Sequence, residues 1–137
     1  MLKKYPTLPI LIVDDEQIAL TSLEMVLNSE GIDNLILCED SREVMDLLSE
    51  NKIGIVLLDL SMPHISGYEL FNQISQQYPG TPIIIVSGEN DLASTVSWIK
   101  EAAYDFLPKP ICEEKFMATL HKALESVGII DNGNYLN

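Results

Sequence analysis

The sequence predicts an α/β domain built on a mostly parallel sheet. Short apolar runs rich in Ile, Val and Leu alternate with longer segments in which apolar residues recur at three- and four-residue steps. The chain has 137 residues, of which 47% are hydrophobic, so it has the size of one domain and enough apolar side chains for its own core. Five β-α units account for this pattern.

The short apolar runs are the predicted strands. They are Ile10–Val13, Leu35–Cys38, Ile53–Leu58, Ile83–Val86 and Asp105–Leu107. The third and fourth runs are apolar almost throughout, so we expect helices over both faces of the sheet. Pro108 lacks a backbone N–H group, which favours an edge position for the fifth strand.

Five helices are predicted between and after these strands, each from one apolar stripe. The stripes are Leu23/Val26/Leu27, Val44/Leu47/Leu48, Leu70/Phe71/Ile74, Leu92/Val96/Ile99 and Phe116/Leu120/Leu124. Gly31 is placed to end the first helix, and Asp40 with Glu43 resembles a capping box that opens the second. The Tyr-Pro-Gly-Thr-Pro segment at residues 78–82 stops the third helix.

Right-handed crossovers leave few arrangements of these elements, and the favoured one is a five-stranded sheet of order 2-1-3-4-5, as in flavodoxin-like folds. A ligand site is then expected at the carboxyl ends of strands one and three. Residues 5–126 are the predicted domain. Residues 127–137 are more polar and rich in Gly and Asn, and we expect them to be a tail or linker.

The charge balance limits the range of partners. Twenty-one acidic residues against eight basic ones give a net charge of −13, which repels nucleic acid phosphates and anionic membranes. Direct DNA binding is therefore not expected. The two cysteines have neither the density nor the spacing of a disulfide framework, and no signal peptide or membrane span is visible. We expect a cytoplasmic protein.

Polar residues follow the predicted strands at one edge of the sheet. Asp14 and Asp15 end the first strand, Asp59 ends the third, Ser87 ends the fourth, and Lys109 follows the fifth. Three converging carboxylates repel one another unless a cation lies between them, and hard oxygen ligands favour Mg²⁺. One carboxylate could act as the nucleophile in phosphoryl transfer, with Lys109 and the Ser87 hydroxyl neutralising phosphoryl oxygens.

Four segments carry a resemblance to a known family. In chain order they are Ile12-Val13-Asp14-Asp15-Glu16, Leu57-Leu58-Asp59-Leu60-Ser61-Met62-Pro63 with Gly67 following, Val86-Ser87-Gly88, and Phe106-Leu107-Pro108-Lys109-Pro110. At these intervals they resemble the signatures of the receiver domain of bacterial two-component response regulators. The likeness runs from about residue 10 to residue 124, and four segments in order make it specific.

The resemblance implies a role for each matching position. Asp59 would be the phosphoacceptor, Asp14 and Asp15 the acidic metal pair, and the Ser61 carbonyl a backbone ligand of Mg²⁺. Lys109 would contact the phosphoryl group, and its bond to Pro110 is expected to be cis.

Two further positions would form the switch that the resemblance implies. The Ser87 hydroxyl would move toward the phosphoryl group while Phe106 turns inward behind it. This chain carries Ser87 where Thr is more usual, and Phe106 where many relatives carry Tyr. Neither difference removes a group that the chemistry needs.

The function implied is a switch in a phosphorelay. Such a domain accepts a phosphoryl group from a histidine kinase or phosphotransfer protein and changes a surface for an output domain or protein, with its only enzymology on itself. A homodimer through the fourth helix, fifth strand and fifth helix is one form that surface can take. The chain can be a free-standing regulator or the first domain of a longer one.

Three other functions are weaker. A Mg²⁺-dependent phosphohydrolase with an aspartate nucleophile is the main alternative, but such enzymes commonly carry a second acid where Ser61 stands. A flavodoxin-like cofactor carrier would need a phosphate-binding loop after the first strand, where Asp14 and Asp15 would repel phosphate. A phosphorylation-independent receiver is disfavoured because the acidic pair, Asp59 and Lys109 are all present.

Overall fold

The computed structural model describes residues 3–128, and within them the sheet has five parallel strands in the order β2-β1-β3-β4-β5. The strands are β1 (Ile10–Val13), β2 (Leu35–Cys38), β3 (Ile55–Leu58), β4 (Ile83–Gly88) and β5 (Asp105–Lys109). Both the parallel sheet and its predicted order are confirmed. Because β1 and β3 are central and neighbouring, their carboxyl ends lie side by side, with Val13 in register with Leu58.

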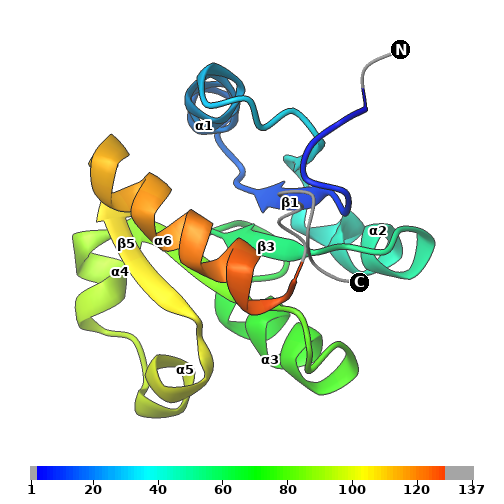
Figure 1. Cartoon of the computed structure of the whole chain (residues 1–137). Coiled ribbons are helices and arrows are strands. Elements are labelled where there is room, and N and C mark those ends of the chain that lie inside the picture. Colours follow the sequence, from blue (N-terminus) through cyan, green and yellow to red (C-terminus); the bar gives the residue numbers. More distant parts are fainter. Residues whose placement is uncertain (1–2, 129–137) are drawn as a thin grey trace.

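Helices cover both faces of this sheet (Figure 1). They are α1 (Gln17–Ser29), the short 3₁₀ helix η1 (Ser41–Glu43), α2 (Val44–Glu50), α3 (Gly67–Gln77), α4 (Glu89–Ala93), α5 (Ser97–Ala102) and α6 (Glu113–Ser126). Apolar side chains of α1 and α6 pack on one face of the sheet, and those of α2, α3 and α5 pack on the other. All four residues of β1 and of β3 are buried, as expected for strands covered on both sides.

The helix boundaries follow local signals in the sequence. Asp40 accepts a hydrogen bond from the Arg42 N–H, so it caps the turn that opens η1 and α2. Gly31 has a φ of +82°, the left-handed conformation that favours glycine after the end of a helix. Ser66 caps α3 by accepting from the Glu69 N–H.

The predicted fourth helix is wrong as a single element. Its stripe is divided between α4 and α5, and Val96 between them is extended and 43% exposed rather than buried. Side-chain hydroxyls explain the break, because the Asp91 carbonyl accepts from the hydroxyls of Ser94 and Thr95, while the Thr95 N–H that would reach it in a continued helix donates to the Leu92 carbonyl. The predicted third strand is also too long, since β3 begins at Ile55.

The C-terminal boundary is tested only in part. Helix α6 ends at Ser126, and the greater part of the predicted tail, residues 129–137, lies outside the described residues. The division into residues 5–126 and 127–137 stays a prediction. In the described part of the chain, none of the helices has the length and apolar character needed to cross a bilayer.

Candidate functional site

The carboxyl edge of the sheet brings together the polar residues that follow its strands. The backbone N–H of Asp59 donates to the Val13 carbonyl at 3.1 Å, which fixes the end of β3 beside the end of β1. Asp14 follows β1 directly, so its side chain and that of Asp59 start from adjacent strands. Ser87 lies in β4 on the other side of β3, and Lys109 ends β5.

Asp14, Asp15 and Asp59 form a carboxylate cluster. Each offers one oxygen atom that lies within 4.8 Å of the other two. Asp14 and Asp59 are only 2% and 6% exposed, whereas Asp15 is half-buried. Burial raises the pKa of Asp59, and the nearby charge of Asp14 raises it further, while the hydrogen bond from Ser87 lowers it.

This cluster suits a hard divalent cation. Three carboxylate oxygens at such short separation would repel one another, and two of them are removed from the water that would otherwise screen them. Carboxylate and carbonyl oxygens are the ligands that Mg²⁺ takes in proteins. Ser61 lies two residues beyond Asp59 and its N–H donates to Asp59 Oδ1 at 3.4 Å, which keeps the loop close to the cluster.

Lys109 supplies a positive charge at the cluster. Its Nζ atom lies 2.5 Å from Asp14 Oδ2 and 3.6 Å from Asp59 Oδ2. Burial tends to lower the pKa of Lys109, but the hydrogen bond to Asp14 and the charge of Asp59 together bring that pKa above its ordinary value. The ammonium is therefore charged at neutral pH. The Lys109–Pro110 bond is cis, as predicted.

The Ser87 hydroxyl links the cluster to α4. Its Oγ atom is 2.8 Å from Asp59 Oδ1 and 3.0 Å from Asp91 Oδ2, and it accepts from the Leu60 N–H at 3.3 Å. Ser87 is fully buried. The sequence analysis identified Ser87 and Asp59 but missed Asp91. The available signal was its spacing, because a residue four positions after Ser87 falls one helical turn away if a helix starts at once.

Phe106 lies behind this part of the site. It is half-buried, lies in register with Ile85 of β4, and packs against the hydrophobic cluster that contains Phe71 and Ile99. Its predicted role as a switch residue stays a prediction.

Gly67 fixes the loop that carries Asp59. A Cβ atom at this position would lie 2.1 Å from the Asp59 carbonyl oxygen and 2.4 Å from the Leu60 Cα atom. The Gly67 N–H donates to the Leu60 carbonyl at 2.9 Å. The start of α3 therefore rests directly on the backbone at the end of β3, where only a hydrogen atom fits.

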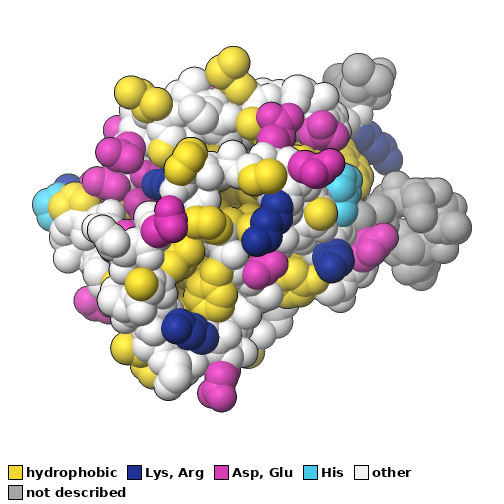
Figure 2. Space-filling view, turned by 90° about the vertical axis from the view of Figure 1, so that its left-hand side faces the viewer, with side chains coloured by type: hydrophobic (Ala, Val, Ile, Leu, Met, Phe, Trp, Pro, Cys, Tyr) yellow, Lys and Arg dark blue, Asp and Glu magenta, His cyan; other side chains and the backbone are white. Residues whose placement is uncertain are grey.

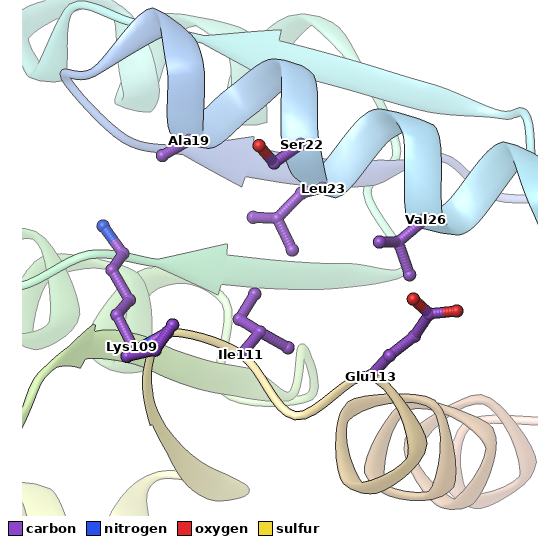
Figure 3. Close-up of a pocket in the computed structure, with 8 residues that line it drawn as sticks. Ala19, Ser22, Leu23, Val26, Lys109, Ile111 and Glu113 are labelled. Carbon is purple, nitrogen blue, oxygen red and sulfur yellow. The ribbon is translucent and has the colours of Figure 1, made fainter.

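An apolar groove of about 280 Å³ runs beside the site, between α1 and the connection from β5 to α6 (Figure 3). Its lining residues are Ala19, Ser22, Leu23, Val26, Lys109, Pro110, Ile111 and Glu113. Leu23 and Ile111 point toward each other across the groove, and Lys109 lies at one end of it (Figure 3). The groove therefore leads from an apolar surface to the carboxylate cluster.

Asp and Glu side chains share the outer surface with exposed apolar ones (Figure 2). Large apolar residues that are more than one-third exposed lie on α1 and around α5. They are Ile18, Met25, Val96, Trp98 and Tyr104.

Comparisons with known proteins agree with this fold. The sequence model of the family described as response regulator receiver domain matches residues 10–121. The chain is 34% identical over 113 residues to the DNA-binding transcriptional regulator NtrC of Klebsiella pneumoniae, covering 82% of this chain and 24% of that protein. It is 33% identical over 120 residues to the NtrX-like putative response regulator of Rickettsia felis, covering 86% and 25%.

Solved structures show the same fold. The signal receiver domain of an HD domain-containing protein from Pseudomonas fluorescens superposes with a TM-score of 0.79 at 29% identity, covering 87% of this chain and 95% of that domain. The chain spans about a quarter of the length of these two curated relatives.

Proposed function

This chain belongs to the response regulator receiver domain family, and from that membership and the geometry of its site we propose that it is a switch activated by phosphorylation of Asp59. The observation that carries the proposal is the position of the Asp59 carboxylate. It is nearly buried at the carboxyl edge of the sheet, with the Lys109 ammonium on one side and the Ser87 hydroxyl on the other.

The side chains proposed for phosphoryl transfer are Asp59, Lys109 and Ser87. A carboxylate oxygen of Asp59 attacks the phosphorus atom of a phosphohistidine, and the new O–P bond forms as the P–N bond breaks and the imidazole nitrogen keeps the electron pair. Lys109 pairs with one phosphoryl oxygen as a compact cation. Ser87 donates its hydroxyl hydrogen to another.

Asp14, Asp15, Asp59 and the Ser61 carbonyl are the proposed ligands of Mg²⁺, which when bound supplies positive charge to offset that of the phosphoryl oxygens. The fit of this ion follows from the carboxylate cluster and its burial. Asp59 then serves both as a ligand and as the acceptor.

The switch follows from the charge that phosphorylation adds. A phosphoryl group brings roughly −1.5 to −2 charge and strong acceptor oxygens, so a state in which Ser87 and Lys109 contact it becomes more stable than one in which they do not. Ser87 moves toward the phosphoryl group, and Phe106 turns into the space behind it. A full change of population needs a difference of roughly 5.5 kcal/mol between the two states.

The proposed partners are a phosphohistidine donor and an output domain or protein. The groove between α1 and the connection to α6 ends at Lys109, and Ile18 on α1 is 83% exposed, so an apolar donor surface can dock there beside Asp59.

Output would act through α4, α5, β5 and α6, where Trp98 and Tyr104 are exposed, and homodimerisation through this face is one such output. We place this activity in the cytoplasm. The family match supports the switch and gives no support to a phosphohydrolase.

The test is incubation with Mg²⁺ and acetyl phosphate, followed by measurement of intact mass. We expect the chain to gain one phosphoryl group, and Asp59→Asn to gain none. Asp46→Asn is the matched control, because Asp46 is an exposed residue on α2 that does not belong to the carboxylate cluster, and this variant should be phosphorylated normally. A phosphoryl group that is still gained after Asp59→Asn would refute the assignment.

A further inference from the structure

Asp91 competes with Asp59 for the hydrogen atom of one hydroxyl group. Asp91 Oδ2 lies 3.0 Å from Ser87 Oγ, and Asp59 Oδ1 lies 2.8 Å from the same atom. The Leu60 N–H, at 3.3 Å, already donates to this oxygen. Because a hydroxyl carries one hydrogen atom, Ser87 can donate to only one of the two carboxylates at a time.

The backbone of Asp91 is held as firmly as its side chain. Its carbonyl accepts hydrogen bonds from the Tyr68 hydroxyl on α3 at 3.3 Å and from the buried Thr95 hydroxyl at 2.8 Å. Asp91 therefore connects Ser87 both to α3 and to the break between α4 and α5. Its carboxylate is only partly exposed, and the hydrogen bonds to its carbonyl limit the movement of the residue.

We propose that Asp91 is a positioning residue that competes with a phosphoryl group on Asp59 for the hydrogen atom of the Ser87 hydroxyl, and thereby opposes the phosphorylated arrangement of the domain. The inference rests on the proposed function. In the phosphorylated state Ser87 gives its hydrogen atom to a phosphoryl oxygen, so the bond to Asp91 is lost. The Asp91 carboxylate is then left close to a group that carries almost two negative charges.

Removing the Asp91 charge should therefore favour the phosphorylated arrangement. Asp91→Asn keeps the shape of the side chain, weakens it as a competitor for the Ser87 hydrogen atom and removes its repulsion of the phosphoryl group. The probe is beryllium fluoride with Mg²⁺, a non-hydrolysable mimic of the phosphoryl group, and calorimetric titration gives its dissociation constant. We expect binding to tighten on the order of tenfold in Asp91→Asn. Glu101→Gln, with the same loss of charge at an exposed position on α5, should leave the affinity unchanged.

A double-mutant cycle separates positioning of Ser87 from a general structural effect. In a Ser87→Ala background Asp91 has no hydroxyl to hold, so only the loss of repulsion remains and Asp91→Asn should tighten binding clearly less than it does in the unaltered chain. Asp91→Ala serves as a second variant and should also bind the mimic more tightly than the unaltered chain. Far-UV circular dichroism checks that each variant is folded.

Each outcome decides between the proposals. If the unaltered chain does not bind the mimic, both the proposed function and this inference are overturned. If the unaltered chain binds it and Asp59→Asn abolishes binding, but Asp91→Asn binds with equal or lower affinity, only the role of Asp91 is refuted. An undiminished gain in the Ser87→Ala background also refutes it, because Asp91 would not be acting through Ser87.

Discussion

Asp59→Asn should stabilise the fold when no divalent cation is present. The carboxylates of Asp14, Asp15 and Asp59 have oxygen atoms within 4.8 Å of one another, and burial raises the pKa of Asp59 above its ordinary value, with the charge of Asp14 as a second cause. An asparagine keeps an oxygen atom that can accept from Ser87, but it carries no charge. The substitution therefore removes repulsion and retains a hydrogen bond.

The size of the effect follows from the distances. Asp59 is repelled by both Asp14 and Asp15, and two unit charges 4.8 Å apart interact by about 3.5 kcal/mol at an effective dielectric constant of about 20, so the two repulsions together reach about 7 kcal/mol. Loss of the attraction between Asp59 and Lys109, whose atoms are 3.6 Å apart, offsets about 4.6 kcal/mol of this gain, and screening by water reduces the remainder. The expected net increase in the free energy of unfolding is about 1 to 2 kcal/mol, which raises the midpoint of thermal unfolding by about 4 to 8 °C.

The pH dependence has a fixed sign. A carboxyl group whose pKa is raised in the folded state binds its proton more tightly there than in the unfolded chain, so ionised Asp59 costs stability at neutral pH. That cost disappears as the pH falls through the raised pKa. The advantage of Asp59→Asn should therefore be largest at neutral pH and should shrink on acidification.

Urea unfolding with EDTA at several pH values measures this difference. Asp46→Asn, an exposed control, should change stability by less than about 0.5 kcal/mol. Adding Mg²⁺ at about ten times its dissociation constant should stabilise the unaltered chain by about 1.4 kcal/mol and the Asp59→Asn variant by much less. The reasoning fails if Asp59→Asn is less stable than the unaltered chain in EDTA, or if Mg²⁺ stabilises both proteins equally.

Three further predictions concern the supports of the site. Gly67→Ala should lower the free energy of unfolding by about 1 to 3 kcal/mol, because the new Cβ atom overlaps the backbone of Asp59. The same overlap should slow phosphorylation by acetyl phosphate. An unchanged denaturation midpoint would contradict this prediction. Iodoacetamide at pH 8 should label the exposed Cys112 and spare Cys38. Cys38 is buried, and burial raises the pKa of its thiol to about 11, so little of it is thiolate. Mass spectrometry of the folded chain should therefore find one adduct rather than two. Ser41→Ala should lower the free energy of unfolding, measured by chemical denaturation, by about 1 to 3 kcal/mol. The buried Ser41 hydroxyl donates to the Pro63 carbonyl and accepts from the Ile65 N–H in the loop after β3. A smaller loss would mean that water takes the place of the hydroxyl.

The fold could be predicted where burial dominates the sequence pattern. The bounds of β1 match the predicted run because all four of its residues are buried between two layers of helices. The bounds of β2 also match, although this edge strand has only one buried residue, Cys38. The spacing of Leu92, Val96 and Ile99 predicted one continuous helix, and this prediction is wrong because Val96 is exposed and does not belong to a buried helix face. The break depends on hydroxyl groups of Ser94 and Thr95 that compete with the backbone, and periodicity does not report such competition.

The site could be predicted to the extent that topology creates it. Parallel strands place their carboxyl ends at one edge of the sheet. Once the strand order is known, Asp14, Asp59 and Lys109 are therefore expected to lie at that edge, as they do. Asp91 could not be found in this way. Its carboxylate reaches Ser87 only because α4 begins directly after Gly88, and apolar spacing does not fix a helix start to one residue.

From the position of Lys109 we expect the proposed phosphoryl acceptance to depend on a second positive charge. Its ammonium lies 2.5 Å from Asp14 but 3.6 Å from Asp59, so before phosphorylation it mainly neutralises Asp14. To pair with a phosphoryl oxygen on Asp59, Lys109 has to give up part of that bond, and a carboxylate that is only 2% exposed is costly to leave without a partner. A cation held by Asp14 and Asp15 would remove this cost and would free Lys109 for the phosphoryl group. We therefore expect the acidic pair, besides binding that cation, to decide whether Lys109 is available to Asp59.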